Sequence, residues 1–264
     1  MHIIRRIGAF AAVLAAVTLI AAGCGGGGKD KLKVGTKFDQ PLFGLKSAGG
    51  DVQGFDAEIA RLIAKEIGRD DVEFVEAVSK NREPFLQDGT VDMVIATYTI
   101  NDERKQKVDF VGPYYIARQD IMVKKDNDTI KSVDDLNGKK VCSAKGSTSA
   151  KNVVAKAPQA QLIELDTYSL CAEQLRDGRV EAVSTDDAIL LGLISQSPND
   201  FKLVNAPFSE EPWGIGVKKG SDLKGKVEEA LKKIIADGRW ADAYKRTVGA
   251  YQPNTPPPPQ VVPQ

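Results

Sequence analysis

The feature that most constrains the fold of this chain is a weak internal repeat. Leu86–Val94 resembles Leu175–Val183, and the two segments share a leucine, an aspartate, a glycine and two valines at corresponding positions. Each copy reads as the end of a helix, a glycine turn and the start of a strand. The repeat therefore predicts two similarly built lobes, and chance recurrence of a common helix-turn-strand unit is the alternative.

Polar residues follow both copies of the repeat. They are Thr97 and Thr99 after the first copy, and Thr185 and Asp186 after the second. Open α/β sheets bind ligands beyond the carboxyl ends of their parallel strands. We therefore expect these side chains to face a ligand.

From Lys31 onward, short apolar strands alternate with amphipathic helices. This order predicts an α/β fold with a mainly parallel sheet and helices on its faces. Helices are expected at about Asp56–Ile67 and Leu223–Val248, because apolar residues recur there every three or four positions. The proline-rich residues 252–264 predict a disordered or polyproline II tail.

Residues 1–23 have the layout of a secretion signal, in which two arginines precede an uncharged run and small residues precede Cys24. The run is shorter than the roughly 20 residues that a membrane-spanning helix needs. We interpret Cys24 as an acylated N-terminal residue and the glycine-rich residues 24–30 as a flexible tether. The alternative is an ordinary cleavage site with Cys24 as a bystander.

The chain without residues 1–23 has 241 residues, a formal net charge of −2 and no histidine, because His2 is the only one. Its length suits one large domain or two lobes. The lack of histidine excludes histidine-based triads, metal sites and pH switches. The near-balance of charge gives no reason to expect nucleic acid as a partner. We expect neither a metal nor a cofactor.

Two further cysteines, Cys142 and Cys171, remain if Cys24 carries a lipid. In an exported protein a disulfide between them is the default. It would close a loop of about 29 residues and contribute roughly 3 to 4 kcal/mol to stability in the chain-entropy model. Two buried free thiols are the alternative.

Three predicted helix starts follow apolar strands and carry hydroxyl or charged side chains, at residues 97–104, 145–150 and 185–187. In the second, Ser147 and Thr148 would present hydroxyls beside free backbone N–H groups, an arrangement that suits a carboxylate. The alternative is that these residues only cap the helix.

Opposite charges stand at the other two helix starts. Arg104 lies in a first helical turn, where a cation opposes the helix dipole, and this placement suggests an anion nearby. A guanidinium can bind a carboxylate through two parallel hydrogen bonds. Asp186 follows a strand and could hold an ammonium group. The alternatives are a solvated surface arginine and an aspartate that only caps its helix.

Several motifs, spread over nearly the whole chain after residue 23, resemble those of one known family. They are Gly54–Asp56, Ile100–Arg104, Val108–Phe110, Pro113–Tyr115, Asp135–Lys139, Gly146–Thr148 and Trp213–Val217 followed by Lys219–Gly220. Together they resemble the polar amino-acid binding proteins of ATP-driven importers, in the bacterial extracellular solute-binding family 3. Lys37–Pro41 and the positions of the two cysteines are most similar to glutamate-binding lipoproteins of actinobacteria.

The resemblance implies a periplasmic-binding-protein-like type II fold with two α/β lobes. Lobe one would comprise residues 31–114 and 214–251, and lobe two residues 115–213. Two strands, near Tyr115–Arg118 and Glu210–Trp213, would cross between the lobes as a hinge.

The resemblance also implies roles for particular side chains. Arg104 and Thr99, with backbone N–H groups near Thr148, would hold the α-carboxylate of an amino acid. Asp186 and the region of Thr97 would hold its α-ammonium group. Some relatives have glycine at position 97 and lysine at position 144, whereas this chain has threonine and alanine there, so those contacts do not carry over.

Lys37 occupies a position that faces the ligand side chain in this family, where relatives for uncharged or basic ligands often carry aspartate. A cation there favours an acidic ligand, and Arg82 would be a second cation. An exposed lysine and a surface arginine are the alternatives. Glutamate is therefore the expected ligand, with glutamine, aspartate and asparagine as alternatives.

The expected function is capture of this amino acid for the permease subunits of an ABC importer. The protein would be a monomer, anchored by lipid to the extracellular face of the cell membrane. A sensor that reports to a membrane receptor or kinase is a second interpretation. A carboxylate-based lyase or dehydratase on the same scaffold, with Asp186 or Glu211 as the acid or base, is a third.

Overall fold

The computed structural model describes residues 31–264 except 70, 253 and 254. The proposed signal, tether and Cys24 lie outside the described residues. Within the described ranges, no helix has both the length and the apolar composition needed to cross a membrane.

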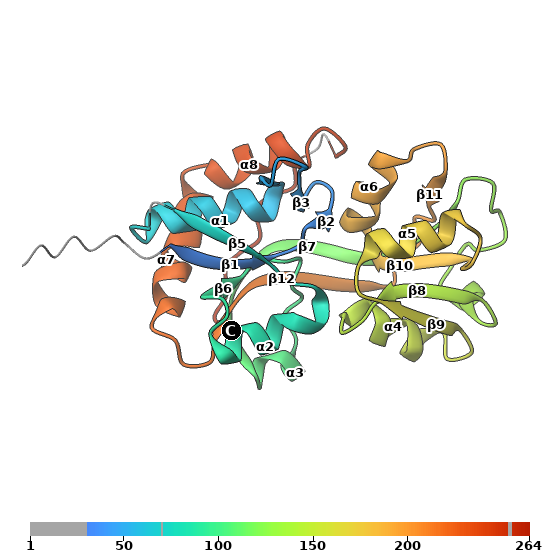
Figure 1. Ribbon diagram of the computed structural model, residues 1–264, viewed down its shortest axis with the longest axis horizontal. Helices are drawn as coiled ribbons and strands as arrows, with labels where there is room; N and C mark the ends of the chain where they lie inside the picture. Colours follow the sequence, from blue (N-terminus) through green and yellow to red (C-terminus); the bar gives the residue numbers. More distant parts are fainter. Residues whose placement is uncertain (1–30, 70, 253–254) are drawn as a thin grey trace, which may run out of the picture. The chain divides into compact units, whose positions relative to one another are not determined.

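The described residues form two lobes that share two long strands (Figure 1). The shared strands are β7 (Val108–Lys124) and β12 (Ser209–Lys218). Lobe one further contains β1 (Leu32–Thr36), β2 (Asp39–Gln40), β3 (Gly44–Lys46), β4 (Val52–Gln53), α1 (Phe55–Glu66), β5 (Val72–Glu76), η1 (Ser79–Asn81), α2 (Arg82–Asp88), β6 (Met93–Val94), α3 (Asp102–Lys105), α7 (Leu223–Ala236) and α8 (Arg239–Thr247). Lobe two contains η2 (Asp134–Leu136), β8 (Lys140–Ala144), α4 (Thr148–Lys156), β9 (Gln161–Leu165), α5 (Tyr168–Arg176), β10 (Ala182–Asp186), α6 (Asp187–Gln196) and β11 (Phe201–Leu203).

One continuous sheet runs through both lobes in the order β5-β1-β6-β12-β7-β10-β8-β9, and β11 also pairs with β7. Pairing is parallel between β1, β5 and β6 in lobe one, and between β8, β9 and β10 in lobe two. The shared strands are antiparallel to each other. The predicted α/β fold is therefore confirmed, and the sheet is antiparallel wherever another strand pairs with β7 or β12.

The predicted hinge lies on these shared strands, where Tyr115 pairs with Trp213 and Arg118 pairs with Glu210. The Tyr115 ring stacks on the Trp213 indole at a centroid distance of 4.7 Å. Phe43 of lobe one meets the indole edge-on at 5.0 Å. Large aromatic surfaces thus fix the lobe-one end of the hinge.

Both copies of the repeat have the predicted structure. In the first, α2 ends before Gly89, whose φ of 79° closes the helix, and β6 follows. In the second, α5 is followed by Gly178 with a φ of 72°, and then by β10. A left-handed residue after a helix favours glycine, because a β-carbon would be strained there.

Two elements differ from the sequence-based expectation. The C-terminal helix is not continuous, because α7 and α8 are separated at Gly238, which has a φ of 87°. Residues 255–264 form neither helix nor strand, as expected, but they contact lobe one, so they differ from the disordered alternative: the Val262 N–H donates to the Gly112 carbonyl at 3.0 Å, and Val261 packs on the main core. The polyproline II alternative stays a prediction. The apolar residues of this segment account for that contact.

Candidate functional site

The side chains singled out in the sequence gather where the two lobes meet. Lys37 follows β1, Thr97 and Thr99 follow β6, Ser147 follows β8, and Asp186 ends β10. These are the carboxyl ends of parallel strands, where open α/β sheets bind ligands. All eight predicted site residues are buried except Thr148, which is half-buried.

Lys37 is 2% exposed, so the alternative of a solvated lysine is wrong. Its ammonium group donates to the Ser79 hydroxyl at 2.9 Å. Burial, followed by the charges of Arg82 and Arg104, lowers the pKa of Lys37 to about 7. A negative charge placed beside this ammonium would restore its ordinary pKa.

Arg82 is also buried, at 2% exposure. Its Nε donates to the Ser79 carbonyl at 3.2 Å, and its Nη1 donates to the carbonyls of Ala96 and Thr97 at 3.1 and 3.2 Å. Burial and then Arg104 lower the pKa of Arg82 to about 10. The guanidinium remains charged at neutral pH and is held by neutral carbonyl groups.

Arg104 belongs to lobe one but reaches lobe two. Its Nε donates to the Glu83 carboxylate at 3.1 Å, its Nη1 to the Thr99 carbonyl at 2.8 Å and its Nη2 to the Gly146 carbonyl at 3.2 Å. The ring of Tyr98 lies below both guanidinium groups, 4.8 Å from Arg104 Cζ and 4.4 Å from Arg82 Cζ. An aromatic ring in contact with two cations attracts both and reduces the cost of placing them together.

Thr97 has a φ of 46°, a left-handed conformation that is uncommon for a β-branched residue. Its N–H donates to the Asp56 carboxylate at 2.8 Å, and the Tyr114 hydroxyl donates to the same carboxylate at 2.7 Å. Burial raises the pKa of Asp56 to about 6. Asp56 thus fixes the strained turn that carries Thr97.

Lobe two supplies hydroxyl groups at the start of α4. Ser147 caps this helix, because its hydroxyl accepts a hydrogen bond from the Ala150 N–H at 2.9 Å. The hydroxyls of Thr148 and Thr99 lie 3.2 Å apart across the two lobes. The first turn of α4 therefore adjoins the groups around Arg104.

Asp186 is 3% exposed and makes no capping hydrogen bond to α6 in the described structure, so the cap interpretation is wrong. Its Oδ2 accepts from the Trp213 indole N–H at 2.6 Å, and its Oδ1 from the Ser149 hydroxyl at 3.4 Å. Burial and then the charge of Glu211 raise the pKa of Asp186 well above its ordinary value. A cationic group beside it would stabilise the ionised form.

Sequence reasoning missed the site roles of Asp56, Tyr168 and Trp213, and it named Glu211 only as a candidate acid or base. Asp56 had a signal, because it is an acid on the apolar side of the predicted α1. Tyr168 is 3% exposed, and burial followed by the Asp186 charge raises the pKa of its phenol. No local pattern marks Tyr168 or Trp213 as site residues, since only the fold brings them beside Asp186.

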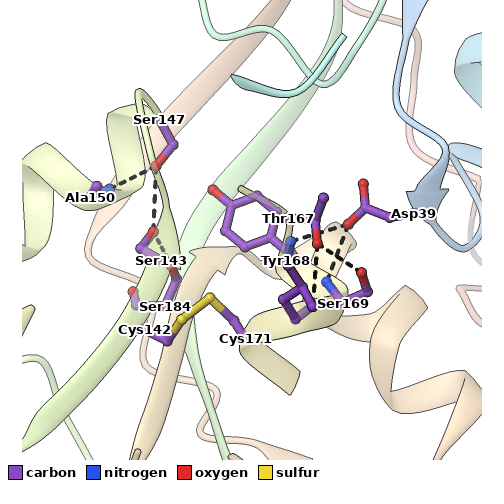
Figure 2. Close-up of a disulfide and its surroundings, with 11 residues drawn as sticks. Asp39, Cys142, Ser143, Ser147, Ala150, Thr167, Tyr168, Ser169, Cys171 and Ser184 are labelled. Carbon is purple, nitrogen blue, oxygen red and sulfur yellow. Dashed lines mark hydrogen bonds between the residues drawn. A yellow bond between two sulfur atoms is a disulfide. The ribbon is translucent and has the colours of Figure 1, made fainter. Parts of the chain in front are cut away.

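The predicted disulfide between Cys142 and Cys171 is present, with an S–S distance of 2.02 Å (Figure 2). It joins β8 to α5 inside lobe two. As for metals, the described residues contain no group of three or more histidine, cysteine, aspartate or glutamate residues that could hold an ion.

The arrangement can bind a small zwitterion between the lobes. Lobe one presents three buried cations, Lys37, Arg82 and Arg104, and lobe two presents the buried Asp186 carboxylate. Buried charges require partners of opposite sign, and a ligand with both signs supplies them. Two α/β lobes on shared strands with this site between them define a solute-binding protein.

The chain belongs to the bacterial extracellular solute-binding proteins, family 3, whose sequence model matches residues 32–250. It is 44% identical over 224 residues to the ABC transporter glutamine-binding protein GlnH of Bacillus subtilis (strain 168), covering 83% of this chain and 81% of that protein. It is 39% identical over 268 residues to the glutamate-binding protein GluB of Corynebacterium glutamicum, covering 92% and 90%.

A similar solved structure is that of an ancestral arginine-binding protein bound to glutamine. It has 43% sequence identity and a TM-score of 0.79, and the match covers 83% of this chain and 98% of that one. The family resemblance seen in the sequence is confirmed.

Proposed function

We propose that this protein captures an amino acid, glutamate in particular, for an ABC-type importer by closing its two lobes around it. The observation that carries the proposal is the division of buried charge, with Lys37, Arg82 and Arg104 in lobe one and Asp186 in lobe two. The similarity to a glutamine-binding protein and a glutamate-binding protein supports the same class of ligand.

The main-chain groups of an amino acid match two parts of the site. Arg104 and the first turn of α4 suit the α-carboxylate, because a guanidinium and helix N–H groups both favour an anion. Asp186 suits the α-ammonium group, whose charge would offset the repulsion between Asp186 and Glu211. Binding would thus relieve unfavourable electrostatics on both lobes.

Lys37 supports glutamate over glutamine. In the buried site its pKa is lowered to about 7, so the ammonium form is poorly stabilised there. The side-chain carboxylate of glutamate would stabilise it, and the neutral amide of glutamine would do so less. Arg82 lies close enough to repel Lys37 and would share that carboxylate.

We also propose that the protein is a lipoprotein, with the lipid on Cys24 and residues 24–30 as its tether. In this proposal the protein is a monomer held at the extracellular face of the cell membrane, within reach of its permease subunits. Mass spectrometry of the mature N-terminus tests this part independently, and an unacylated N-terminus contradicts it.

Calorimetric titration with each of the twenty amino acids tests the ligand. We expect one site per chain, with glutamate bound more tightly than glutamine. Absence of binding by any amino acid contradicts the proposal, and tighter binding of glutamine contradicts the assignment of Lys37. Analysis of the recovered ligand separates capture from catalysis, because conversion of the amino acid would identify an enzyme.

A further inference from the structure

The start of α5 makes direct hydrogen bonds to the opposite lobe. Asp39, on β2 of lobe one, accepts two bonds through Oδ2, from the Tyr168 N–H at 3.1 Å and from the Ser169 N–H at 3.2 Å. The partners are 129 and 130 residues apart in the sequence. Figure 2 shows the Asp39 carboxylate directed at these two N–H groups.

A carboxylate such as that of Asp39 is a favourable partner for the N-terminus of a helix. The first N–H groups of a helix have no partner within it, and the helix dipole favours an anion at that end. Thr167 takes one of these groups with its own hydroxyl, which accepts from the Leu170 N–H at 3.3 Å. Asp39 takes two others, so the N-terminus of α5 is completed by a residue of the opposite lobe.

A second, independent contact lies beside the first. Gly192, inside α6 of lobe two, faces the Pro41 carbonyl of lobe one so closely that a β-carbon on Gly192 would be 2.3 Å from that oxygen. Glycine within a helix costs stability relative to alanine, by about 0.5 to 1 kcal/mol. The close approach of Pro41 is a physical reason for glycine at this position.

Helix α5 is in turn connected to the ligand-binding side of lobe two. The Cys142–Cys171 disulfide fastens it to β8, which ends just before the turn that carries Ser147. The Ser143 and Ser147 hydroxyls lie 3.4 Å apart along this connection (Figure 2). Tyr168, whose N–H Asp39 binds, is itself buried at the site.

We infer that residues 39–41 form a closure lip: Asp39 is a positioning residue that fastens lobe two over the ligand through α5, and Gly192 provides the space in which Pro41 seats. The inference rests on the proposed function, because it assigns these residues to the closing step of that capture. Neither Asp39 nor Gly192 needs to touch the ligand. Both act on how long it is retained.

The test compares Asp39→Ala and Gly192→Ala with the unaltered full-length protein. Stopped-flow kinetics with L-glutamate and L-glutamine measure association and dissociation, and small-angle X-ray scattering measures closure. We expect dissociation to be about tenfold faster or more in each variant, with association within about twofold, since charged hydrogen bonds and steric clashes act on the closed state. Asp39→Asn, which keeps an oxygen acceptor but loses the charge, should give an intermediate rate.

Asp51→Ala is the matched control, because Asp51 is an exposed aspartate of lobe one whose bonds to Gln53 and Arg61 stay within that lobe. It should leave both rate constants unchanged. Gly192→Ala separates faster ligand release from misfolding, because alanine favours a helix more than glycine does. Faster dissociation without a loss of thermal stability in this variant supports the inference. Wild-type dissociation rates in both lip variants would overturn it.

The same scattering measurement separates this inference from the proposed function. If the unaltered protein bound no amino acid, the proposed function would be wrong, and the lip would then be judged on ligand-free protein. A lower closed fraction in Asp39→Ala and Gly192→Ala than in Asp51→Ala would support it. Identical scattering of all four proteins would overturn it.

Discussion

The two lobes contribute opposite chemistry to the same site. Lobe one provides three buried cations, Lys37, Arg82 and Arg104, held largely by carbonyl oxygens and by the face of an aromatic ring. Lobe two provides hydroxyl groups, the N-terminus of α4 and the buried carboxylate of Asp186. Lobe one is therefore suited to the negative groups of a ligand and lobe two to its positive group.

This difference explains why the ligand should favour closure. In separated lobes, Arg104 would keep its pair with Glu83, whereas Lys37, Arg82 and Asp186 would have water as a partner. When the lobes close, both sets lose water, and a zwitterion of the right size supplies the opposite charges. Both lobes therefore contribute to binding, and substitutions in each lobe should weaken it in different ways.

Replacing Cys142 and Cys171 by alanine should weaken lobe two selectively. The disulfide links residues that are 29 positions apart, and its loss should lower the free energy of unfolding by about 3 kcal/mol or more. Denaturant titration measures the loss, and hydrogen exchange locates it, with α1 amides of lobe one as the internal control. Equal unfolding free energies, or faster exchange only in α1, would contradict this prediction.

Arg104→Met should remove the main anion partner on lobe one. We expect affinity for glutamate and for glutamine to fall about 100-fold, close to 3 kcal/mol, because both carry the same α-carboxylate. Calorimetry measures both. Arg61→Met is the control, since Arg61 is an exposed arginine of lobe one paired with Asp51. A fall for glutamate alone would assign Arg104 to the side chain of the ligand instead.

Asp186→Asn tests the opposite lobe. An asparagine can still accept the Trp213 N–H bond, but it loses the charge that would pair with an ammonium group. Glutamate affinity should fall by roughly 30-fold. Glutarate, which has both carboxylates and no ammonium group, is the informative comparison: the variant should bind it at least as well as the wild type. Equal losses for glutamate and glutarate would show that Asp186 acts only on structure.

Lys37→Met, in lobe one, should reduce the preference of the site for glutamate over glutamine. Glutamate affinity is expected to fall about tenfold while glutamine affinity changes by less than about threefold, because only glutamate has a second carboxylate. Competition binding measures the ratio. Lys65→Met is the matched control, because Lys65 is an exposed lysine on the outer side of α1. An unchanged ratio in Lys37→Met would remove Lys37 from the ligand side-chain pocket.

The smallest effect concerns pH. Burial at the site lowers the pKa of Lys37 to about 7, and the glutamate carboxylate would raise it, so the complex should bind more protons than the free protein above pH 7. Glutamate affinity should therefore decrease as pH rises from about 7, by at most about tenfold per unit. Calorimetry in buffers of different ionisation enthalpy should detect proton uptake. Lys37→Met should lack this slope, and a slope that persists in the variant would assign it to another group.

The sequence predicts much of the framework because its signals are local. The 3.6-residue period identified α1 to within one residue at each end, and the repeat identified the turns at Gly89 and Gly178. The division of the C-terminal helix at Gly238 was missed, because its apolar period continues on both sides. The contact of Val261 and Val262 with lobe one was missed since a proline-rich composition says nothing about docking.

By itself, the sequence determined the alternation of strands and helices, the pairing of the two cysteines and the residue types of the site, because each depends on spacing or composition. Only the tertiary structure decided which of these polar groups are helix caps and which are buried charged groups. Ser147 became a helix cap, whereas Lys37, Arg82 and Asp186 became buried charges. Asp39 became a link between lobes. Burial and the approach of distant segments fix these roles, and neither is encoded in any local stretch of the chain.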